Sequence, residues 1–200
     1  LLNSLPTKEA KAKAMAGIEA AFQGRSMNQL PPELVAAMSA AGSASPTLRL
    51  RQGDAAAVAE ALKEISNEAG DATKRQQVIA IFGTIQQPSC VPVLLKIVKD
   101  SRNDGLRSVA LGSLQSYANP EIGKEVVAVY KDLPEEVRAV AQSLLASRSA
   151  WATLLVDAVD ARQIEAKGIH EATVRRLLLS DSSRVREACK KHWGELATAS

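Results

Sequence analysis

Four segments of this chain repeat one pattern, in which an arginine is followed by a smaller apolar residue at position +3 and a large apolar residue at position +7. The arginines are Arg75, Arg107, Arg138 and Arg186, and successive ones are 32, 31 and 48 residues apart. A repeat of just over thirty residues is typical of folds that stack one supersecondary unit many times. It constrains the fold strongly, because such a unit buries its apolar side only against its neighbours.

Positions −1, +2, +3, +6 and +7 around the arginine form one helical stripe, which is fully apolar in the third copy: Val137, Val140, Ala141, Leu144 and Leu145. The first copy is weaker, because Lys74 and Gln77 occupy two of the five positions. This spacing is typical of a helix that faces a core. Further helices are predicted before the four copies, over residues 54–67, 91–99, 122–130 and 150–159. One more, over 171–179, accounts for the longer last interval.

The composition agrees with helices, because the hydrophobic fraction is 46% while aromatic residues make up only 3%. Alanine and leucine, which dominate the apolar positions, are strong helix formers. No run alternates with the period of two that marks strands. The sequence therefore predicts an all-α protein, built as a right-handed α-solenoid of helix pairs.

We expect one domain over residues 1–200, with a degenerate helix pair in 1–47 and the repeats in 48–200. In the N-terminal part, helices are predicted over 7–22 and 31–41, and Thr7 is a candidate N-cap. Because the sequence opens with Leu1 rather than methionine, it reads as a fragment of a longer protein.

Local signals refine the predicted helix ends and their packing. Asp104 and Asp181 are candidate N-caps, and Pro92 and Pro134 are placed in first turns, where a missing N–H costs nothing. At position +5 the first three copies have small residues and the fourth has a lysine: Ala80, Gly112, Ser143 and Lys191. We expect the small residues to admit a neighbouring helix, and Lys191 to lie on an exposed face where the array ends.

The charged residues suggest two roles. The repeat arginines Arg75, Arg107 and Arg138 are interpreted as struts that pair with an aspartate or a carbonyl of a neighbouring layer, and an anion-binding ladder is the alternative. A C-terminal basic patch forms a candidate surface for an acidic or phosphate-bearing partner: Arg175, Arg176, Arg184, Arg186, Lys190 and Lys191. The net charge of +3 and scattered aromatics do not resemble a dedicated nucleic-acid surface.

Residues that could carry chemistry are few. His170 and His192 have no partner at metal-ligand spacing, and His192 is expected to pack beside Trp193. Cys90 and Cys189 are predicted to be free and buried. Asp157 and Asp160, three apart on one helix face, are interpreted as a solvated face rather than an acid–base pair. We therefore predict no catalytic, metal-binding or cofactor-binding residue in this chain, and no apolar run reaches the roughly 18 residues of a membrane span.

The repeat resembles the HEAT repeat, in which a valine–arginine step begins the second helix of each pair. The steps Leu106-Arg107, Val137-Arg138 and Val185-Arg186 match it, whereas Lys74-Arg75 departs from it. The resemblance implies paired helices in a superhelical stack.

Longer stretches look like one segment of large exported proteins of planctomycete-type bacteria, usually labelled membrane-bound dehydrogenases or haem-binding proteins. The matching stretches are Leu48-Arg-Leu-Arg-Gln-Gly-Asp54, Ala146-Ser-Arg-Ser-Ala-Trp151 with Leu154-Leu-Val-Asp-Ala158, Val174-Arg-Arg-Leu-Leu178 and His192-Trp-Gly-Glu195. The resemblance implies a periplasmic or exported setting and a c-type haem elsewhere in the parent protein. No Cys-x-x-Cys-His motif occurs here, so no haem attachment is carried over.

The leading hypothesis is a non-catalytic scaffold that spaces or docks other domains of an exported redox protein. One alternative is a stand-alone adaptor that binds a protein partner. Another, of a different class, is a HEAT-like DNA-binding protein resembling the alkylpurine glycosylases. That alternative requires a basic groove with aromatic residues, whereas Tyr117, Tyr130, Trp151 and Trp193 are scattered along the sequence.

Overall fold

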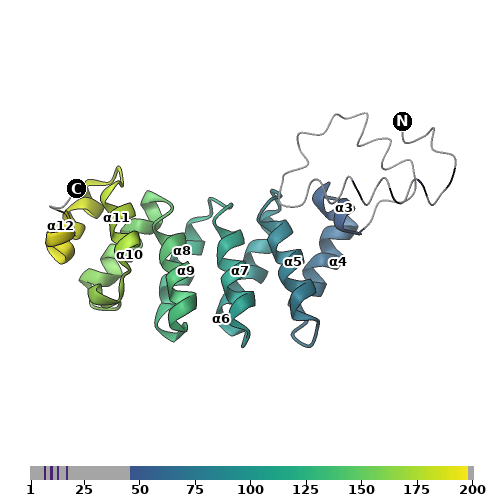
Figure 1. Ribbon diagram of the computed structural model, residues 1–200, viewed down its shortest axis with the longest axis horizontal. Coiled ribbons are helices and arrows are strands. Elements are labelled where there is room, and N and C mark those ends of the chain that lie inside the picture. The colour runs from purple at the N-terminus through teal and green to yellow at the C-terminus, as the bar shows by residue number, and fades with distance from the viewer. Residues whose placement is uncertain (1–6, 8–9, 11–12, 14–16, 18–45, 198–200) are drawn as a thin grey trace. The chain divides into compact units, whose positions relative to one another are not determined.

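The computed structural model describes residues 7, 10, 13, 17 and 46–197, and these residues form helices joined by short connections (Figure 1). No strand occurs among them, so the predicted all-α class is confirmed for this part of the protein. The helices predicted in 1–47 lie outside the described residues, apart from one contact: Thr7 Oγ1 accepts a hydrogen bond from the Ala10 N–H at 3.1 Å, as its assignment as an N-cap predicts.

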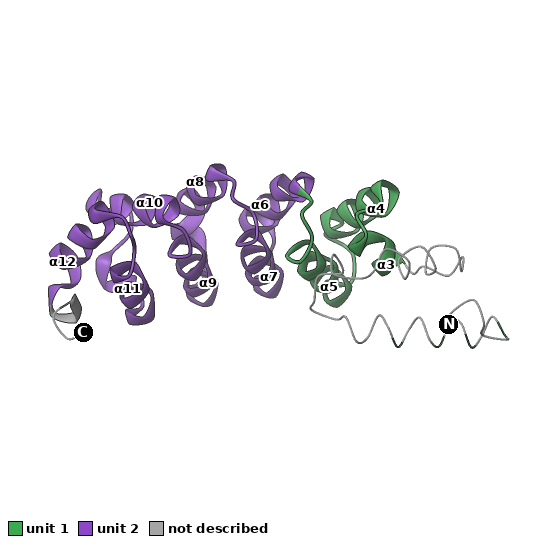
Figure 2. Ribbon diagram, turned by 90° about the horizontal axis from the view of Figure 1, so that it is seen from above, with its two compact units in different colours: residues 1–87 green, residues 88–200 purple. Residues whose placement is uncertain are grey.

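The protein divides into two compact units, residues 1–87 and 88–200 (Figure 2). The described helices of the first unit are α3 (Pro46–Arg51), α4 (Ala55–Ser66) and α5 (Ala72–Phe82). Both α3 and α5 pack on α4. The prediction of a single domain over all 200 residues stays a prediction.

The second unit contains seven α-helices and three short 3₁₀ turns within its described residues. The helices are α6 (Val91–Asp100), α7 (Asp104–Leu114), α8 (Pro120–Val129), α9 (Glu135–Leu145), α10 (Ser149–Asp160), α11 (Glu171–Leu178) and α12 (Ser183–Ala197). The 3₁₀ turns are η3 (Pro88–Cys90), η4 (Tyr130–Asp132) and η5 (Ala166–Gly168). The predicted helices over 91–99, 122–130, 150–159 and 171–179 all appear, with ends shifted by one or two residues.

Helices of the second unit pack in alternation. Helix α7 packs on α6 and on α9, while α8 packs on α6 and on α10. As a result α6, α8 and α10 lie in one row and α7 and α9 in another, as Figure 2 shows. At the C-terminal end, α12 packs on both α11 and α10.

In the third copy the core agrees with the predicted stripe except at one position. Val137, Ala141, Leu144 and Leu145 are fully buried, but Val140 at +2 is partly exposed. In the first three copies the residue at position +4 is buried instead of the one at +2. These buried residues are Ile79, Leu111 and Gln142. Positions +2 and +4 flank the stripe on opposite sides, so the buried face is turned toward +4.

Helix ends depend on side chains that accept hydrogen bonds from first-turn amides. Asp54, Asp71 and Asn119 cap α4, α5 and α8 in this way. The prediction of Asp104 as a cap was wrong by one residue, because the Asn103 side chain accepts from the Leu106 N–H and Asp104 is the first helical residue. Pro134 likewise precedes α9 rather than lying in its first turn.

Two further corrections concern helix contacts. Asp181 is not a cap, since Ser182 Oγ accepts the Val185 N–H in the turn that begins α12. The small residues at +5 do not admit a neighbouring helix: Ala80, Gly112 and Ser143 are all exposed. The close approach lies elsewhere, at Gly123 of α8, where an added Cβ would fall 2.5 Å from the buried Trp151 ring of α10.

Candidate functional site

The C-terminal basic patch is largely neutralised within the molecule. Arg175 pairs with Glu171 at 2.7 Å, and Arg186 donates to the Ser180 carbonyl at 2.6 Å. Arg184 and Lys191 both bind Asp160. Arg176 and Lys190 are exposed and have no hydrogen bond or ion pair with a described residue. Since four of the six cations already have partners, the patch offers far fewer free charges than its sequence suggests.

Asp160, at the end of α10, is the centre of a cluster that links α10 to α12. Its carboxylate accepts from Arg184 Nη2 at 2.5 Å and from Lys191 Nζ and His192 Nε2 at 2.6 Å each. Arg184 also binds Asp157, at 2.6 Å. Hydrogen bonds from Lys191, then Arg184 and His192, hold the pKa of Asp160 well below its usual range, because each stabilises the charged carboxylate. Asp157 and Asp160 are thus bridged by an arginine rather than free as an acid–base pair.

The end of α12 is fixed beside this cluster. His192 lies edge-on to Trp193, with ring centroids 5.6 Å apart, which confirms the predicted packing of the two rings. The Trp193 indole N–H donates to the Ala166 carbonyl of η5 at 3.0 Å. Lys191 is 64% exposed, so its predicted exposure is confirmed.

Three of the four repeat arginines bind a backbone carbonyl at the end of the preceding helix or just after it. Arg75, which is buried, donates from Nε and Nη2 to the Ile65 carbonyl at 3.1 and 2.8 Å. Arg107 reaches the Lys99 carbonyl at 3.3 Å, and Arg186 reaches that of Ser180. These bonds satisfy orphan carbonyls at helix C-termini. They join each arginine to the helix that precedes it in the chain, whereas the strut interpretation placed the partner in a neighbouring layer.

Arg138 differs from the other three. It forms no hydrogen bond or ion pair with any residue that the structure describes. Its Nε is buried without a partner, as is that of Arg107. The preceding helix α8 continues into the 3₁₀ turn η4 before α9 begins. The carbonyls that an arginine of this repeat would otherwise bind therefore belong to a different turn geometry.

Four residues after Arg138, Gln142 is completely buried and holds three segments together. Its Nε2 donates to the Tyr130 hydroxyl at 2.7 Å and to the Gly168 carbonyl at 2.8 Å. Its Oε1 accepts from the His170 N–H at 2.8 Å and from Thr173 Oγ1 at 3.3 Å. The amide is thereby fully satisfied, which a buried polar group requires, and it fixes the start of α11. Burial raises the pKa of the Tyr130 hydroxyl, which stays neutral.

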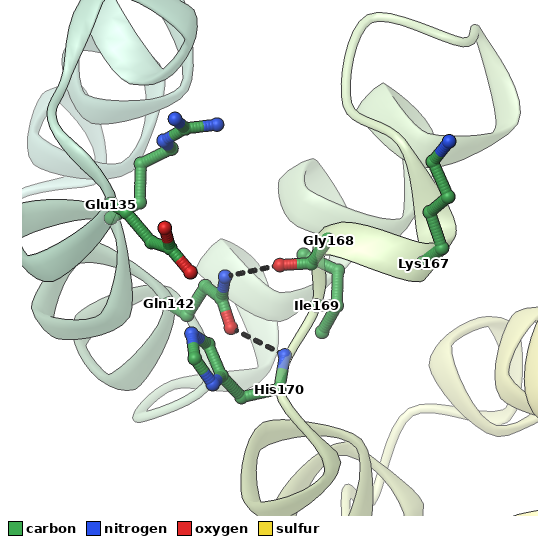
Figure 3. Close-up of a pocket in the computed structure, with 7 residues that line it drawn as sticks. Glu135, Gln142, Lys167, Gly168, Ile169 and His170 are labelled. Carbon is green, nitrogen blue, oxygen red and sulfur yellow. Dashed lines mark hydrogen bonds between the residues drawn. The ribbon is translucent and has the colours of Figure 1, made fainter.

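A pocket of about 260 Å³ opens beside this network (Figure 3). Helix α9 lines it with Glu135, Arg138 and Gln142, and the lead-in to α11 lines it with residues 167–170. In Figure 3 the Gln142 amide lies between Gly168 and the His170 nitrogen, and the Lys167 side chain points away from it. Lys167 is 85% exposed and pairs with Glu165 at 3.3 Å.

This pocket is the candidate functional site. The sequence analysis considered two of its residues, Arg138 as a strut and His170 as a histidine without a partner at metal-ligand spacing, and it did not bring them together. Gln142 and the other lining residues were missed. A signal was present, because Gln142 is a polar residue at the +4 position, where the two preceding copies have Ile79 and Leu111. It was overlooked because +4 was not counted in the buried stripe.

The described residues include no group of three or more histidine, cysteine, aspartate and glutamate side chains that could hold a metal ion. Cys90 and Cys189 are free and buried, as predicted. Burial raises the pKa of the Cys189 thiol to about 11. Among the described helices, none has both the length and the apolar character that crossing a membrane requires.

Chemically, the pocket offers a guanidinium, an imidazole and one carboxylate around a fixed amide. Such a set binds and orients a polar ligand through charge and hydrogen bonds. Comparison of the sequence and structure with protein-family models, with curated proteins and with solved structures gives no match.

Proposed function

We propose that this chain is a non-catalytic scaffold, a right-handed α-solenoid of HEAT-like helix pairs that spaces or docks other protein domains. The observation that supports it most is the equivalence of α7 and α9. Each begins three residues before a repeat arginine, buries the same positions and packs on the other, while α6 and α8 pack beside them. Helix pairs that repeat in this way bury their apolar sides layer by layer.

The stacking proposal has a direct test in repeat insertion. A quasi-one-dimensional array tolerates an extra unit, because each layer contacts only its neighbours. We expect a variant in which residues 88–118 are duplicated in tandem to fold, with helical circular dichroism that rises in proportion and cooperative unfolding. The matched control inserts the same residues in scrambled order, which should not add ordered helix. Aggregation of the duplicated protein, or behaviour equal to the scrambled control, would contradict the stack.

The docking role can be tested with a photo-crosslinking amino acid. Ser143 on α9 and Ala128 on α8 are both exposed and belong to different rows of the second unit. A docking surface on the α7–α9 row predicts crosslinks from position 143 to one defined protein, and few from position 128. Equal, unspecific labelling from both positions would argue against docking on this row.

The proposed setting rests on the resemblance to exported haem-binding and dehydrogenase-labelled proteins. In that setting the redox chemistry lies in other parts of the parent protein. The purified protein, incubated with haem and reductant, should then show neither a covalently attached haem spectrum nor dehydrogenase turnover. Either signal would overturn the non-catalytic assignment.

Two alternatives give different outcomes in the same experiments. A stand-alone adaptor would crosslink to a protein that is encoded separately. A DNA-binding protein would bind duplex DNA with an affinity that falls steeply with salt. The ion pairs of Arg175, Arg184 and Lys191 speak against DNA, because these cations already have carboxylate partners.

A further inference from the structure

We propose that the pocket beside α9 binds a carboxylate group through the guanidinium of Arg138. This inference is independent of the scaffold proposal, since it depends on the pocket alone and would hold for a small molecule or a peptide. The ligand chemistry is a single carboxylate, which a glutamate or aspartate residue, the C-terminus of a peptide or a free organic acid can supply.

The first argument is the state of Arg138. Arg75, Arg107 and Arg186 use their guanidinium groups on backbone carbonyls, but Arg138 binds no described residue. Its side chain is partly buried and its Nε is shielded from solvent without an acceptor. The buried Nε alone does not set Arg138 apart, because Arg107 Nε is buried without a partner as well. The Arg138 Nη groups, however, have no partner among the described residues and are not fully buried, so they can donate to an external acceptor.

The second argument is that the wall opposite Arg138 is rigid. Gln142, one turn further along α9, is fixed by four hydrogen bonds of 2.7–3.3 Å, and it holds Gly168 and His170 of the facing segment in place. A pocket whose walls are already ordered loses little conformational entropy when a ligand binds. The site is therefore preorganised rather than a gap between mobile side chains.

The third argument concerns charge. The pocket is lined by two cations, Arg138 and Lys167, and by one anion, Glu135. Lys167 pairs with Glu165 and points away from the Gln142 amide, so the charges that face a ligand are those of Arg138 and Glu135. Glu135 repels a phosphate dianion more strongly than a carboxylate monoanion, because the repulsion grows with the charge of the ligand. A carboxylate can also accept two parallel N–H groups from a guanidinium.

The fourth argument is size. A volume of about 260 Å³ lies just below the roughly 300–1,000 Å³ of pockets that enclose drug-sized ligands. The pocket accommodates one functional group and a short stem rather than a whole cofactor. A carboxylate on an acidic residue, at a peptide terminus or on a small acid meets this requirement.

Arginine Nε–H resonances of the whole 200-residue chain, recorded by ¹H–¹⁵N NMR at constant ionic strength, test the proposal. The probes are acetate, its neutral analogue acetamide and inorganic phosphate. We expect acetate to shift the Arg138 Nε–H resonance in a saturable way and acetamide to leave it unchanged. Binding of phosphate ten times tighter than acetate would overturn the carboxylate assignment.

Variants locate the site. We expect Arg138→Gln to weaken acetate binding at least tenfold. Arg138→Lys should retain part of the binding, because lysine keeps the positive charge but cannot donate two parallel N–H groups to one carboxylate. Arg176→Gln is the matched control, since Arg176 is likewise unpaired with described residues but is exposed and lies outside the pocket; it should change binding less than twofold. Equal effects of Arg138→Gln and Arg176→Gln, with both variants folded by circular dichroism, would overturn the proposal.

Two further probes distinguish the sources of the carboxylate. N-acetyl-glutamic acid α-amide presents the carboxylate of an acidic residue, and N-acetylglycine presents that of a peptide terminus. Tighter binding of one than of acetate identifies the source, and weaker binding of both supports a free small acid. If none of the three carboxylates shifts the Arg138 Nε–H resonance of the wild-type protein, the site is refuted. The repeat-insertion test of the scaffold is unaffected by that result.

Discussion

The second and third copies of the repeat share a register and differ in what they do with it. In α7 the residues at +0 and +4 are Arg107 and Leu111: the arginine binds the end of α6 and the leucine is fully buried. In α9 they are Arg138 and Gln142: the arginine is left without a described partner and the buried glutamine forms four hydrogen bonds. The same helix position thus serves apolar packing in one copy and polar contacts to a neighbouring segment in the next.

The difference follows from what lies next to each copy. Beside α9 lie the extra turn η5 and the extra helix α11. The segment between them carries backbone groups that need hydrogen-bond partners, among them the Gly168 carbonyl and the His170 N–H. The His170 side chain does not cap α11. Gln142 instead accepts from the N–H of His170, the residue before α11, and from the Thr173 hydroxyl in its first turn. A repeat therefore becomes irregular where it has to hold a segment that the other copies do not contain.

The largest effect on stability is expected when a glutamine is placed at position +4 of the second copy, where the native residue is leucine. Leu111→Gln should lower the free energy of unfolding by about 3–5 kcal/mol, because the buried leucine is lost and an amide is buried with no partners arranged for it. The midpoint of urea unfolding at unchanged slope measures this. Ala128→Gln, at an exposed position, is the control and should stay within about 0.5 kcal/mol.

The reverse exchange sharpens the comparison. Gln142→Leu should cost about 2–3 kcal/mol, since the Gly168 carbonyl and the His170 N–H lose their partner in a buried setting. Amide hydrogen exchange should accelerate at the start of α11 more than in α7. Ser143→Ala, on the exposed side of the same helix, serves as control. Equal exchange throughout residues 168–173 in mutant and wild type would show that Gln142 does not hold this segment.

Replacing a repeat arginine that binds a carbonyl should lower the stability of the protein more than replacing one that does not. Arg75→Gln should lower the free energy of unfolding by about 1.5–3 kcal/mol, because the guanidinium is buried and makes two charged hydrogen bonds to Ile65. Arg138→Gln should change it by less than about 0.5 kcal/mol, as no described partner is lost. Thermal or urea unfolding of the two variants side by side measures the contrast, and equal losses would remove the distinction between strut and free arginine.

The smallest effect concerns acid stability at the C-terminal end. The pKa of Asp160 is lower in the folded state than in the unfolded one, so its contribution is fully present above the ordinary value of about 3.9. It is lost as pH falls through the lower folded value. Between pH 5 and 2, wild type should therefore lose more stability than Asp160→Asn, and the two urea midpoints should converge. Curves that stay parallel over this window would contradict the role of the Asp160 cluster.

Much of this fold is readable from local patterns, because each helix has its own apolar stripe and punctuation. The helices over 91–99, 122–130, 150–159 and 171–179 were predicted close to their observed bounds. The rotation of the stripe was harder to read. Positions +2 and +4 are both apolar in the second copy, as Val109 and Leu111, so hydrophobicity alone does not say which one faces the core.

The candidate site was less accessible to sequence reasoning. Arg138 attracted attention as one of a series, yet its difference from Arg107 depends on the turn η4 and on which carbonyls lie within reach. The number of free cations in the basic patch was overestimated for a related reason. Asp157 and Asp160 lie 24 or more residues from Arg184 in sequence, and their pairing appears only when α10 and α12 pack together.

By itself, the amino-acid sequence determined that this protein forms short helices, where most of them begin and end, and that an alanine- and leucine-rich face of each is buried. Those properties are local, because a helix forms its backbone hydrogen bonds within itself and residues close together in sequence determine its apolar periodicity. The tertiary structure decided which arginines bind a carbonyl, which cations are neutralised, and that Gln142 is buried beside a pocket. These depend on side chains that are distant in sequence and meet only through packing, so no local pattern could specify them.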